Sequence, residues 1–196
     1  MKEQPANEIA VLQEITSAIV RERNIKRLLE EILAVLERRM GMLRGTFTLL
    51  EGETLAIAAS HGLEREEAAL GRYHLGEGIT GRVAATGQTE AVEDIRKDPR
   101  FLNRTGARQD ECATSFICVP LVHLSEVIGT LSIDRPFDGD AKRLERDGAF
   151  LEIVANVTAD AAAALLAERE EHENLLAENR RLRDLLGSNP GELVGE

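Results

Sequence analysis

Aromatic residues and long apolar runs are scarce in this sequence, and basic residues are outnumbered by acidic ones. Aromatics make up 3% of the 196 residues, with no tryptophan, so the chain lacks the stacking surfaces that hold single-stranded nucleic acids. The 24 basic and 35 acidic residues give a net charge of −11, which disfavours binding through phosphate groups. No apolar run approaches a membrane span, and the start lacks the apolar segment of an export signal. We therefore expect a cytoplasmic protein without membrane contacts.

Cysteine is also scarce. The chain contains Cys112 and Cys118 and no export signal, so we expect reduced thiols rather than a disulfide. The five residues between them are not a zinc spacing, and the four histidines do not cluster near them in sequence. We therefore predict no metal site. Cys118 lies in an apolar run and is expected in the core, whereas Cys112 lies in a polar segment where a thiol can be exposed and reactive.

The residues that are present indicate one globular domain with an extended segment. Hydrophobic residues make up 43% of the chain and charged residues 30%, which suits a single core. Between residues 8 and 40, isoleucine and leucine recur at steps of three and four, which predicts amphipathic helices. Asn24 is placed to cap a second helix after a break at 21–23.

Short strand-like runs follow the helices. Two hairpins are expected, with turns around Glu51-Gly52-Glu53 and around Leu124-Ser125-Glu126. The runs that form them cover residues 45–50, 54–59, 116–122 and 127–133, and 89–92 is a further short strand. Hairpins favour an antiparallel sheet, and helices at both ends of the chain favour an α+β domain.

From about Ala141 to Leu186 the sequence predicts one long helix without proline. Its first half, through Leu165, is expected to pack on the sheet. Its second half carries apolar residues at alternating steps of four and three, the spacing of a coiled coil, and is expected to pair with a second copy of the chain. The residues assigned to this dimer and signal helix are Leu165, His172, Leu175, Asn179, Leu182 and Leu186. A buried Asn179 would set the register of a parallel dimer. The alternative is a single amphipathic helix that packs back on its own domain.

The segment Gly76-Glu77-Gly78-Ile79-Thr80-Gly81 has the pattern G-x-G-x-x-G of dinucleotide-binding proteins. That reading needs a preceding buried strand and a long helix within a parallel unit. The preceding residues are charged, and the helix expected from Gly78 to about Thr86 is short. We therefore interpret the glycines as positions that allow tight turns, a role that does not exclude a bound ligand.

Taken together, RGTFTLL, LAIAASHGL, LGEGITGRVAATG, DIRKDPRFLNRT, SFICVPL and VIGTLSIDR resemble the N-terminal GAF domain of NifA-type nitrogen-fixation activators. The resemblance implies a central antiparallel sheet flanked by N-terminal helices, with a long C-terminal helix that continues as a coiled coil. We divide the chain into an N-terminal helix (1–23), the GAF sensory domain (24–161), the signalling helix (162–187) and a linker (188–196) into a missing AAA+ domain.

The resemblance also implies a function. Such activators remodel RNA polymerase carrying sigma-54, using an AAA+ ATPase domain, and bind DNA through a helix-turn-helix. Neither domain lies in this chain, which has no G-x-x-x-x-G-K-[ST] motif, so its own role would be sensory rather than enzymatic. In some relatives the GAF domain binds 2-oxoglutarate, and an anti-activator protein opposes it. Relatives with an iron–sulfur cluster carry N-terminal cysteines, and this chain has none before Cys112.

A GAF fold implies a ligand cavity over one face of the sheet, covered by the segment from Leu75 to Arg104. A dicarboxylate such as 2-oxoglutarate would need a cation, ideally an arginine, and Arg82, Arg100 and Arg104 are nearest in sequence. Each of these arginines could instead form an ordinary surface ion pair. The residues assigned to the cavity are Thr46, Ser60, Tyr73, Ile79, Thr80, Arg82, Arg100, Phe101, Cys118 and Leu131.

Two alternatives remain open. Free methionine-R-sulfoxide reductase has the GAF fold and uses a thiolate nucleophile, which Cys112 and Cys118 resemble only loosely. The chain could also be the GAF sensor of another signalling protein, such as a histidine kinase or a cyclic-nucleotide enzyme. No serine–histidine–aspartate or paired-carboxylate site can be specified, and we predict no catalysis.

Overall fold

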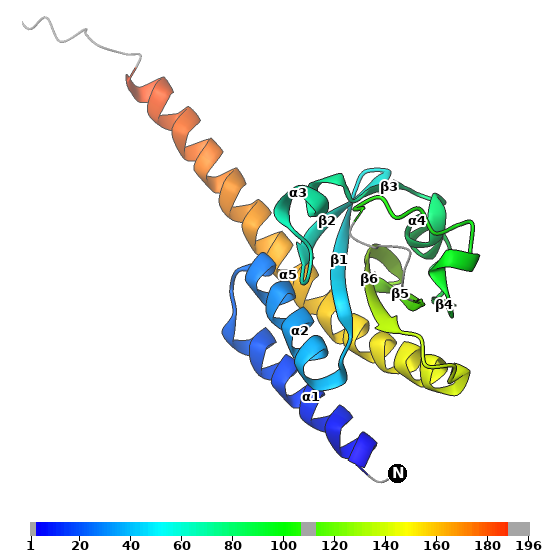
Figure 1. Ribbon diagram of the computed structural model, residues 1–196. Coiled ribbons are helices and arrows are strands. Elements are labelled where there is room, and N and C mark those ends of the chain that lie inside the picture. Colours follow the sequence, from blue (N-terminus) through cyan, green and yellow to red (C-terminus); the bar gives the residue numbers. More distant parts are fainter. Residues whose placement is uncertain (1–2, 107–112, 188–196) are drawn as a thin grey trace, which may run out of the picture.

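The computed structural model describes residues 3–106 and 113–187 (Figure 1). Within them, six strands form one antiparallel sheet in the order β3-β2-β1-β6-β5-β4. The strands are β1 (Leu43–Glu51), β2 (Thr54–Ser60), β3 (Arg72–His74), β4 (Glu90–Val92), β5 (Thr114–His123) and β6 (Glu126–Pro136). The helices are α1 (Glu3–Arg21), α2 (Ile25–Met40), α3 (Arg65–Leu70), α4 (Gly78–Thr86), the 3-10 helix η1 (Ile95–Lys97) and α5 (Ala141–Gly187). This arrangement confirms the predicted α+β fold.

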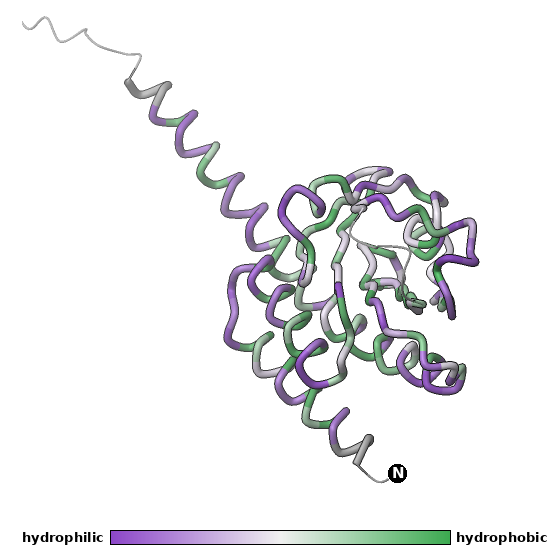
Figure 2. Tube along the Cα trace, viewed as in Figure 1, coloured by the Kyte–Doolittle hydropathy of each residue, from purple (hydrophilic) through white to green (hydrophobic). Residues whose placement is uncertain are grey.

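Helices α1, α2 and α5 form a layer on one face of the sheet, while α4 lies over the other face (Figure 1). The main core fills the space between the sheet and the three long helices, along which hydrophobic residues alternate with hydrophilic ones (Figure 2). It includes Leu29, Ile32, Phe47, Leu131 and Val154, each fully buried. Burying one such side chain contributes about 1.5–3 kcal/mol, so this layer provides most of the stability.

The junction between α1 and α2 confirms the predicted cap. The side chain of Asn24 accepts a hydrogen bond from the backbone N–H of Arg27 at 3.1 Å, which satisfies one of the free donors at a helix start. At the other end of α2, Gly41 adopts a left-handed conformation with φ of 66° and donates to the carbonyl of Glu37 at 2.9 Å. The chain then enters β1.

Both predicted hairpins are present. Gly52, with φ of 64°, turns β1 into β2, and Leu124 and Ser125 adopt positive φ between β5 and β6. The short strand expected near 89–92 is β4. The charged stretch before Gly76 carries no periodicity that predicts structure, but it forms α3 and β3. Strand β3 pairs with the edge of β2, a contact that sequence periodicity over three residues cannot reveal.

The opposite face of the sheet carries a row of small hydroxyl side chains. The hydroxyls of Thr46 and Ser132 lie 2.7 Å apart, as do those of Thr48 and Thr130. All four residues are buried, so these hydrogen bonds satisfy groups that would otherwise be costly to bury. The row provides a polar floor beneath α4.

Helix α5 is a single helix of 47 residues, as expected from the sequence. Its first half packs on the sheet, and the rest extends from the domain as an arm (Figure 1). Between Ala141 and Arg183 it contains a stretch long and apolar enough to cross a membrane, by length and composition only, which corrects the expectation that no apolar run approaches a membrane span. Val154, Ala155 and Ala159 of α5 are buried in the core, which is the usual reason for such composition in a core helix.

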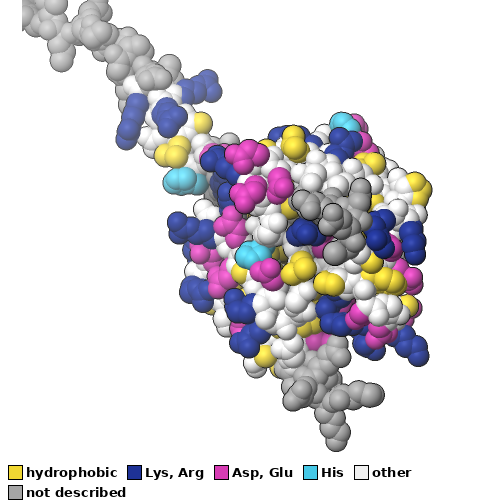
Figure 3. All heavy atoms as spheres, viewed as in Figure 1, with side chains coloured by type: hydrophobic (Ala, Val, Ile, Leu, Met, Phe, Trp, Pro, Cys, Tyr) yellow, Lys and Arg dark blue, Asp and Glu magenta, His cyan; other side chains and the backbone are white. Residues whose placement is uncertain are grey.

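The surface mixes charges of both signs. Acidic and basic side chains lie side by side over the face shown in Figure 3. Many form exposed ion pairs, including Arg38 with Glu14 at 2.9 Å between α1 and α2. Such pairs contribute little individually, and their mixing gives this face no extended surface of a single sign.

Candidate functional site

The glycines of the G-x-G-x-x-G segment shape the start of α4. Gly76 and Gly78 have φ of 81° and 61°, which favour glycine. At Gly81, an added Cβ would lie 2.1 Å from the carbonyl oxygen of His74. The three glycines therefore fold α4 tightly against β3. The sheet is antiparallel at every described pairing, so the segment is not part of a parallel dinucleotide-binding unit.

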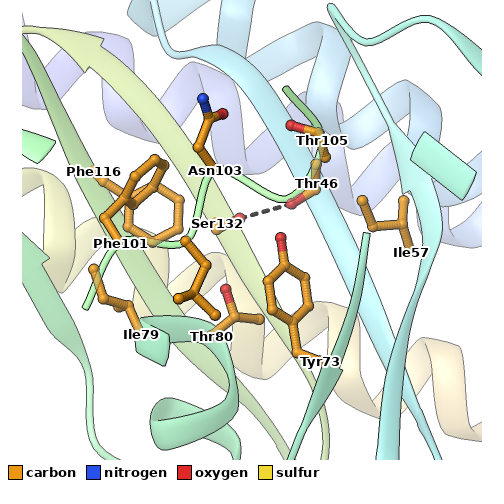
Figure 4. Close-up of a pocket in the computed structure, with 11 residues that line it drawn as sticks. Thr46, Ile57, Tyr73, Ile79, Thr80, Phe101, Asn103, Thr105, Phe116 and Ser132 are labelled. Atoms are coloured by element: carbon orange, nitrogen blue, oxygen red, sulfur yellow. Dashed lines mark hydrogen bonds between the residues drawn. The ribbon is translucent and has the colours of Figure 1, made fainter. Parts of the chain in front are cut away.

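A small cavity lies between this turn, the hydroxyl row and the segment that follows η1 (Figure 4). Its volume is about 20 Å³, roughly the space of one water molecule. Its lining combines apolar side chains with hydroxyls and one amide: Thr46, Ile57, Tyr73, Ile79, Thr80, Phe101, Leu102, Asn103, Thr105, Phe116 and Ser132. The Tyr73 hydroxyl points toward the Thr46–Ser132 pair, and the rings of Phe101 and Phe116 meet edge-on at 5.2 Å (Figure 4).

Half of the residues assigned to the cavity from the sequence line it: Thr46, Tyr73, Ile79, Thr80 and Phe101. Ser60, Arg82, Arg100, Cys118 and Leu131 are absent from the lining. Leu131 alternates with Ser132 on β6 and points into the core beneath the helices. Cys118 lies on the cavity face of the sheet but is enclosed by Thr80 and Thr130. Ser60 pairs with Thr46 one strand farther out.

Arg82 and Arg100 are engaged by carboxylates that do not line the cavity. Arg82 Nε donates to Glu90 at 3.0 Å. Arg100 donates to Glu90 at 2.6 Å and to both carboxylate oxygens of Asp98. The Asp98 partner raises the pKa of Arg100 further, and the same contact lowers the pKa of Asp98. No charged side chain lines the cavity among the residues that the structure describes.

Arg104 is the predicted arginine that reaches the mouth of the cavity. Its guanidinium lies over the ring of Tyr73, 5.9 Å from the ring centroid, at a distance typical of a cation–π contact. It also forms an ion pair with Glu77, at the N-terminus of α4. A hydrogen bond from the backbone N–H of His74 is the main reason that the pKa of Glu77 is lowered, and Arg104 adds to the effect.

Six lining residues were not identified from the sequence: Ile57, Leu102, Asn103, Thr105, Phe116 and Ser132. Phe116 and Ser132 belonged to predicted strands, and their alternation with core residues was an available signal. Asn103 and Thr105 follow Arg100 in an irregular segment, where no periodicity indicates which side chains turn inward.

Residues 22–179 match the sequence profile of the GAF domain family. The chain belongs to the GAF domain family. Nitrogen fixation protein VnfA of Azotobacter vinelandii is 39% identical over 95% of this chain and 37% of its own length. The Nif-specific regulatory protein of Azospirillum brasilense is 32% identical over 93% of this chain and 30% of its own.

These relatives confirm the resemblance to the GAF domains of nitrogen-fixation regulators. The chain spans about a third of the length of the curated relatives that it matches. A crystal structure of the A. aeolicus nlh2 GAF domain in an inactive state has a TM-score of 0.72 at 27% identity, covering 80% of this chain and 96% of that one. The chain is therefore a regulatory, sensory GAF domain.

A reductase also shares the GAF fold. Free methionine-R-sulfoxide reductase from Neisseria meningitidis, solved in complex with its substrate, has a TM-score of 0.70 at 24% identity, covering 86% of this chain and 95% of that one. That likeness shows the fold alone. Burial raises the pKa of Cys118 to about 12, so its thiolate is scarce at neutral pH. Cys112 lies outside the described residues.

The residues assigned to the signal helix of this GAF domain fall into two groups. Leu165 packs partly against the core. His172, Leu175, Asn179 and Leu182 lie on the exposed arm, with Leu175 58% and Leu182 51% exposed. Leu186 lies in the last turns of α5, and its side chain is outside the described residues. The predicted linker at 188–196 is also outside them.

Proposed function

We propose that this GAF domain is the effector-sensing domain of a NifA-type, sigma-54-dependent transcriptional activator and that it controls an adjacent ATPase domain. The observation that supports the proposal best is the cavity between the sheet, α4 and the 101–105 segment, in a domain whose relatives are regulators of nitrogen fixation. A cavity with apolar walls and a few converging polar groups is the usual form of a small-molecule site.

The effector is a small metabolite, for which 2-oxoglutarate is our first candidate. The cavity of about 20 Å³ is far below the roughly 300–1,000 Å³ of typical ligand sites. Binding therefore requires the segment around Phe101–Thr105 to move away from α4. That movement makes the site a switch, because the effector selects an open arrangement of a segment that is otherwise closed.

The output passes through α5. Gly87 caps the end of α4, and two residues later the hydroxyl of Thr89 donates to Glu152 of α5 at 2.5 Å. About two turns farther along α5, His123 at the end of β5 lies 2.8 Å from Asp160. A shift of α4 can thus reach the arm over a short path, and the arm leads toward the domain to be controlled.

The arm is proposed to pair with the arm of a second copy. From Leu166 to Arg183 its residues are exposed, whereas most helical stability in proteins comes from the packing of an apolar face. A coiled coil would bury Leu175 and Leu182. We also propose an anti-activator protein as a partner, a cytoplasmic location, and contact with RNA polymerase and DNA only through other domains.

The test is a thermal-shift titration of the purified chain with 2-oxoglutarate, with glutamine and cyclic nucleotides in parallel. A ligand that binds the folded state adds about 2.7 kcal/mol to the free energy of unfolding at a hundred times its Kd, and this stabilisation raises the melting temperature. A saturable increase with 2-oxoglutarate alone supports a carbon-status sensor. No increase with any of these compounds contradicts a metabolite of this kind and favours a protein partner as the signal.

A further inference from the structure

The ion pair between Glu77 and Arg104, here called the mouth pair, joins the two walls of the cavity. Glu77 lies at the start of α4, and Arg104 lies between Asn103 and Thr105, both of which line the cavity. The guanidinium also covers Tyr73, a third lining residue. The mouth pair therefore holds the 101–105 segment in its closed position against α4.

A second contact closes the same point. Gly78 follows Glu77, and an added Cβ there would lie 2.8 Å from Leu102 Cδ1 and 3.1 Å from the carbonyl oxygen of Arg100. The segment thus packs directly on the first turn of α4, and only glycine leaves space for it. The closed arrangement depends on this packing together with the mouth pair.

The two partners differ in how firmly they are held. One carboxylate oxygen of Glu77 accepts the N–H of His74 at 2.9 Å, independently of Arg104. Glu77 can therefore release the guanidinium and keep its place and its charge. The side chains of Arg104 and Glu77 are 39% and 31% exposed, and ion pairs with this exposure are weak and sensitive to salt. The mouth pair is suited to reversible exchange.

Of the three arginines predicted to meet a ligand, Arg104 is the best placed. Arg82 and Arg100 form ion pairs with Glu90 and Asp98, none of which lines the cavity. Arg104 stands over Tyr73, whose hydroxyl points into the cavity (Figure 4). Its planar guanidinium matches a carboxylate or phosphate in two-point geometry. Glu77 presents that same carboxylate chemistry to it within the protein.

We propose that Arg104 is the residue that determines specificity for an anionic group of the effector, and that Glu77 occupies it while the cavity is closed. Effector binding exchanges one carboxylate for another at Arg104 and frees the 101–105 segment from α4. This inference rests on the proposed sensory function and adds the residue that binds the anionic group and the contact that it exchanges.

The first experiment uses no ligand. Amide hydrogen exchange of the segment 98–106 is measured by mass spectrometry in the full chain and in Glu77→Gln, which keeps the side-chain shape and removes its charge. We expect exchange to increase roughly two- to five-fold, the range given by an exposed ion pair. High NaCl should produce the same increase in the unchanged chain. Asp138→Asn breaks a pair of similar exposure with Arg143 and is the matched control.

The second experiment uses 2-oxoglutarate as the probe, with its affinity measured by calorimetry. Glu77→Gln should bind it roughly two- to five-fold more tightly, because the competing carboxylate is gone. Arg104→Gln should lose binding, and Arg82→Gln should bind as the unchanged chain does.

The outcomes separate the two proposals. Unchanged exchange in Glu77→Gln overturns the mouth pair as the closing contact, whether or not 2-oxoglutarate binds. Equal affinity in Arg104→Gln and in the unchanged chain overturns the role of Arg104. Increased exchange in Glu77→Gln together with no binding of 2-oxoglutarate to any variant supports the closing contact and overturns the proposed effector.

Discussion

Asp94 is a buried carboxylate whose negative charge is stabilised by Arg96, two residues farther along the chain. Its oxygens accept hydrogen bonds from the Arg96 side chain at 2.9 and 2.7 Å and from the Arg96 backbone at 3.1 Å. These contacts lower the pKa of Asp94 to about 2. The pKa of Asp94 is thus lower in the folded state than the value of about 3.9 expected in the unfolded chain. The charged carboxylate therefore stabilises the fold at pH values above about 3.9, and this stabilisation is lost as the pH falls toward 2.

We therefore expect Asp94→Asn to lower the free energy of unfolding at pH 7, measured by urea denaturation. The difference from the unchanged chain should shrink as the pH is lowered through the range from about 4 to 2. Glu93→Gln, at an exposed neighbouring position, is the control and should change little. A difference that stays constant across this pH range would show that the charge of Asp94 is not what stabilises η1.

Cys118 provides a prediction about chemistry at the same scale. It is fully buried, and burial raises its pKa to about 12, so a thiol reagent should meet almost no thiolate in the folded domain. In a Cys112→Ser variant at pH 8, we expect Ellman's reagent to label Cys118 only after unfolding in guanidinium chloride. Rapid, stoichiometric labelling of the folded variant would contradict this and would revive a thiol-based activity.

At the scale of elements, the helix layer depends on a buried ion pair. Arg135 at the end of β6 lies 2.5 Å from Asp147 of α5, and its guanidinium also donates to the carbonyl of Met40 at the end of α2. Both side chains are at least nine-tenths buried. Burial raises the pKa of Asp147, and Arg135 opposes the increase. The pair thus connects three elements of the domain near the start of α5.

Removing one partner should be costly, because it leaves the other charge buried. We expect Asp147→Ala to lower the free energy of unfolding by about 3–5 kcal/mol, measured by urea denaturation. The double replacement Arg135→Met with Asp147→Leu should be much closer to the unchanged chain. If the double variant were as unstable as the single one, packing rather than the unpaired charge would be the dominant cost.

The sequence predicted elements better than the site, for a physical reason. Hairpins and α4 depend on local signals, such as Gly52 in a turn and Gly78 at a helix start. The cavity depends on pairing over long distances: Ser132 meets Thr46 across 86 positions. The partners of Arg82 and Arg100 depend on which side of α4 faces the sheet, and the sequence around α4 leaves that side undetermined.

For the whole molecule, the most exposed feature is the arm of α5. Among the residues described, no side chain from Leu166 onward belongs to the core. Leu175, Leu176 and Leu182 are nevertheless apolar, and all three are exposed. The first half of α5 is different, because Val154 and Ala159 face the domain. A helix that uses one half for its own core and presents apolar residues on the other is suited to joining two copies.

We therefore expect light scattering coupled to size exclusion to give twice the chain mass of 21.5 kDa. Leu175→Asp with Leu182→Asp should give monomers whose core unfolds at nearly the same temperature, since these residues lie outside the core. Asn179→Leu should strengthen the dimer by removing a buried amide, whereas Asn174→Leu adds the same side chain off the apolar stripe and should not. A chain that is monomeric at every concentration would contradict pairing through the arm. If Asn179→Leu strengthens the dimer and the response of the arm to the effector stays the same, the arm is a spacer rather than a switch.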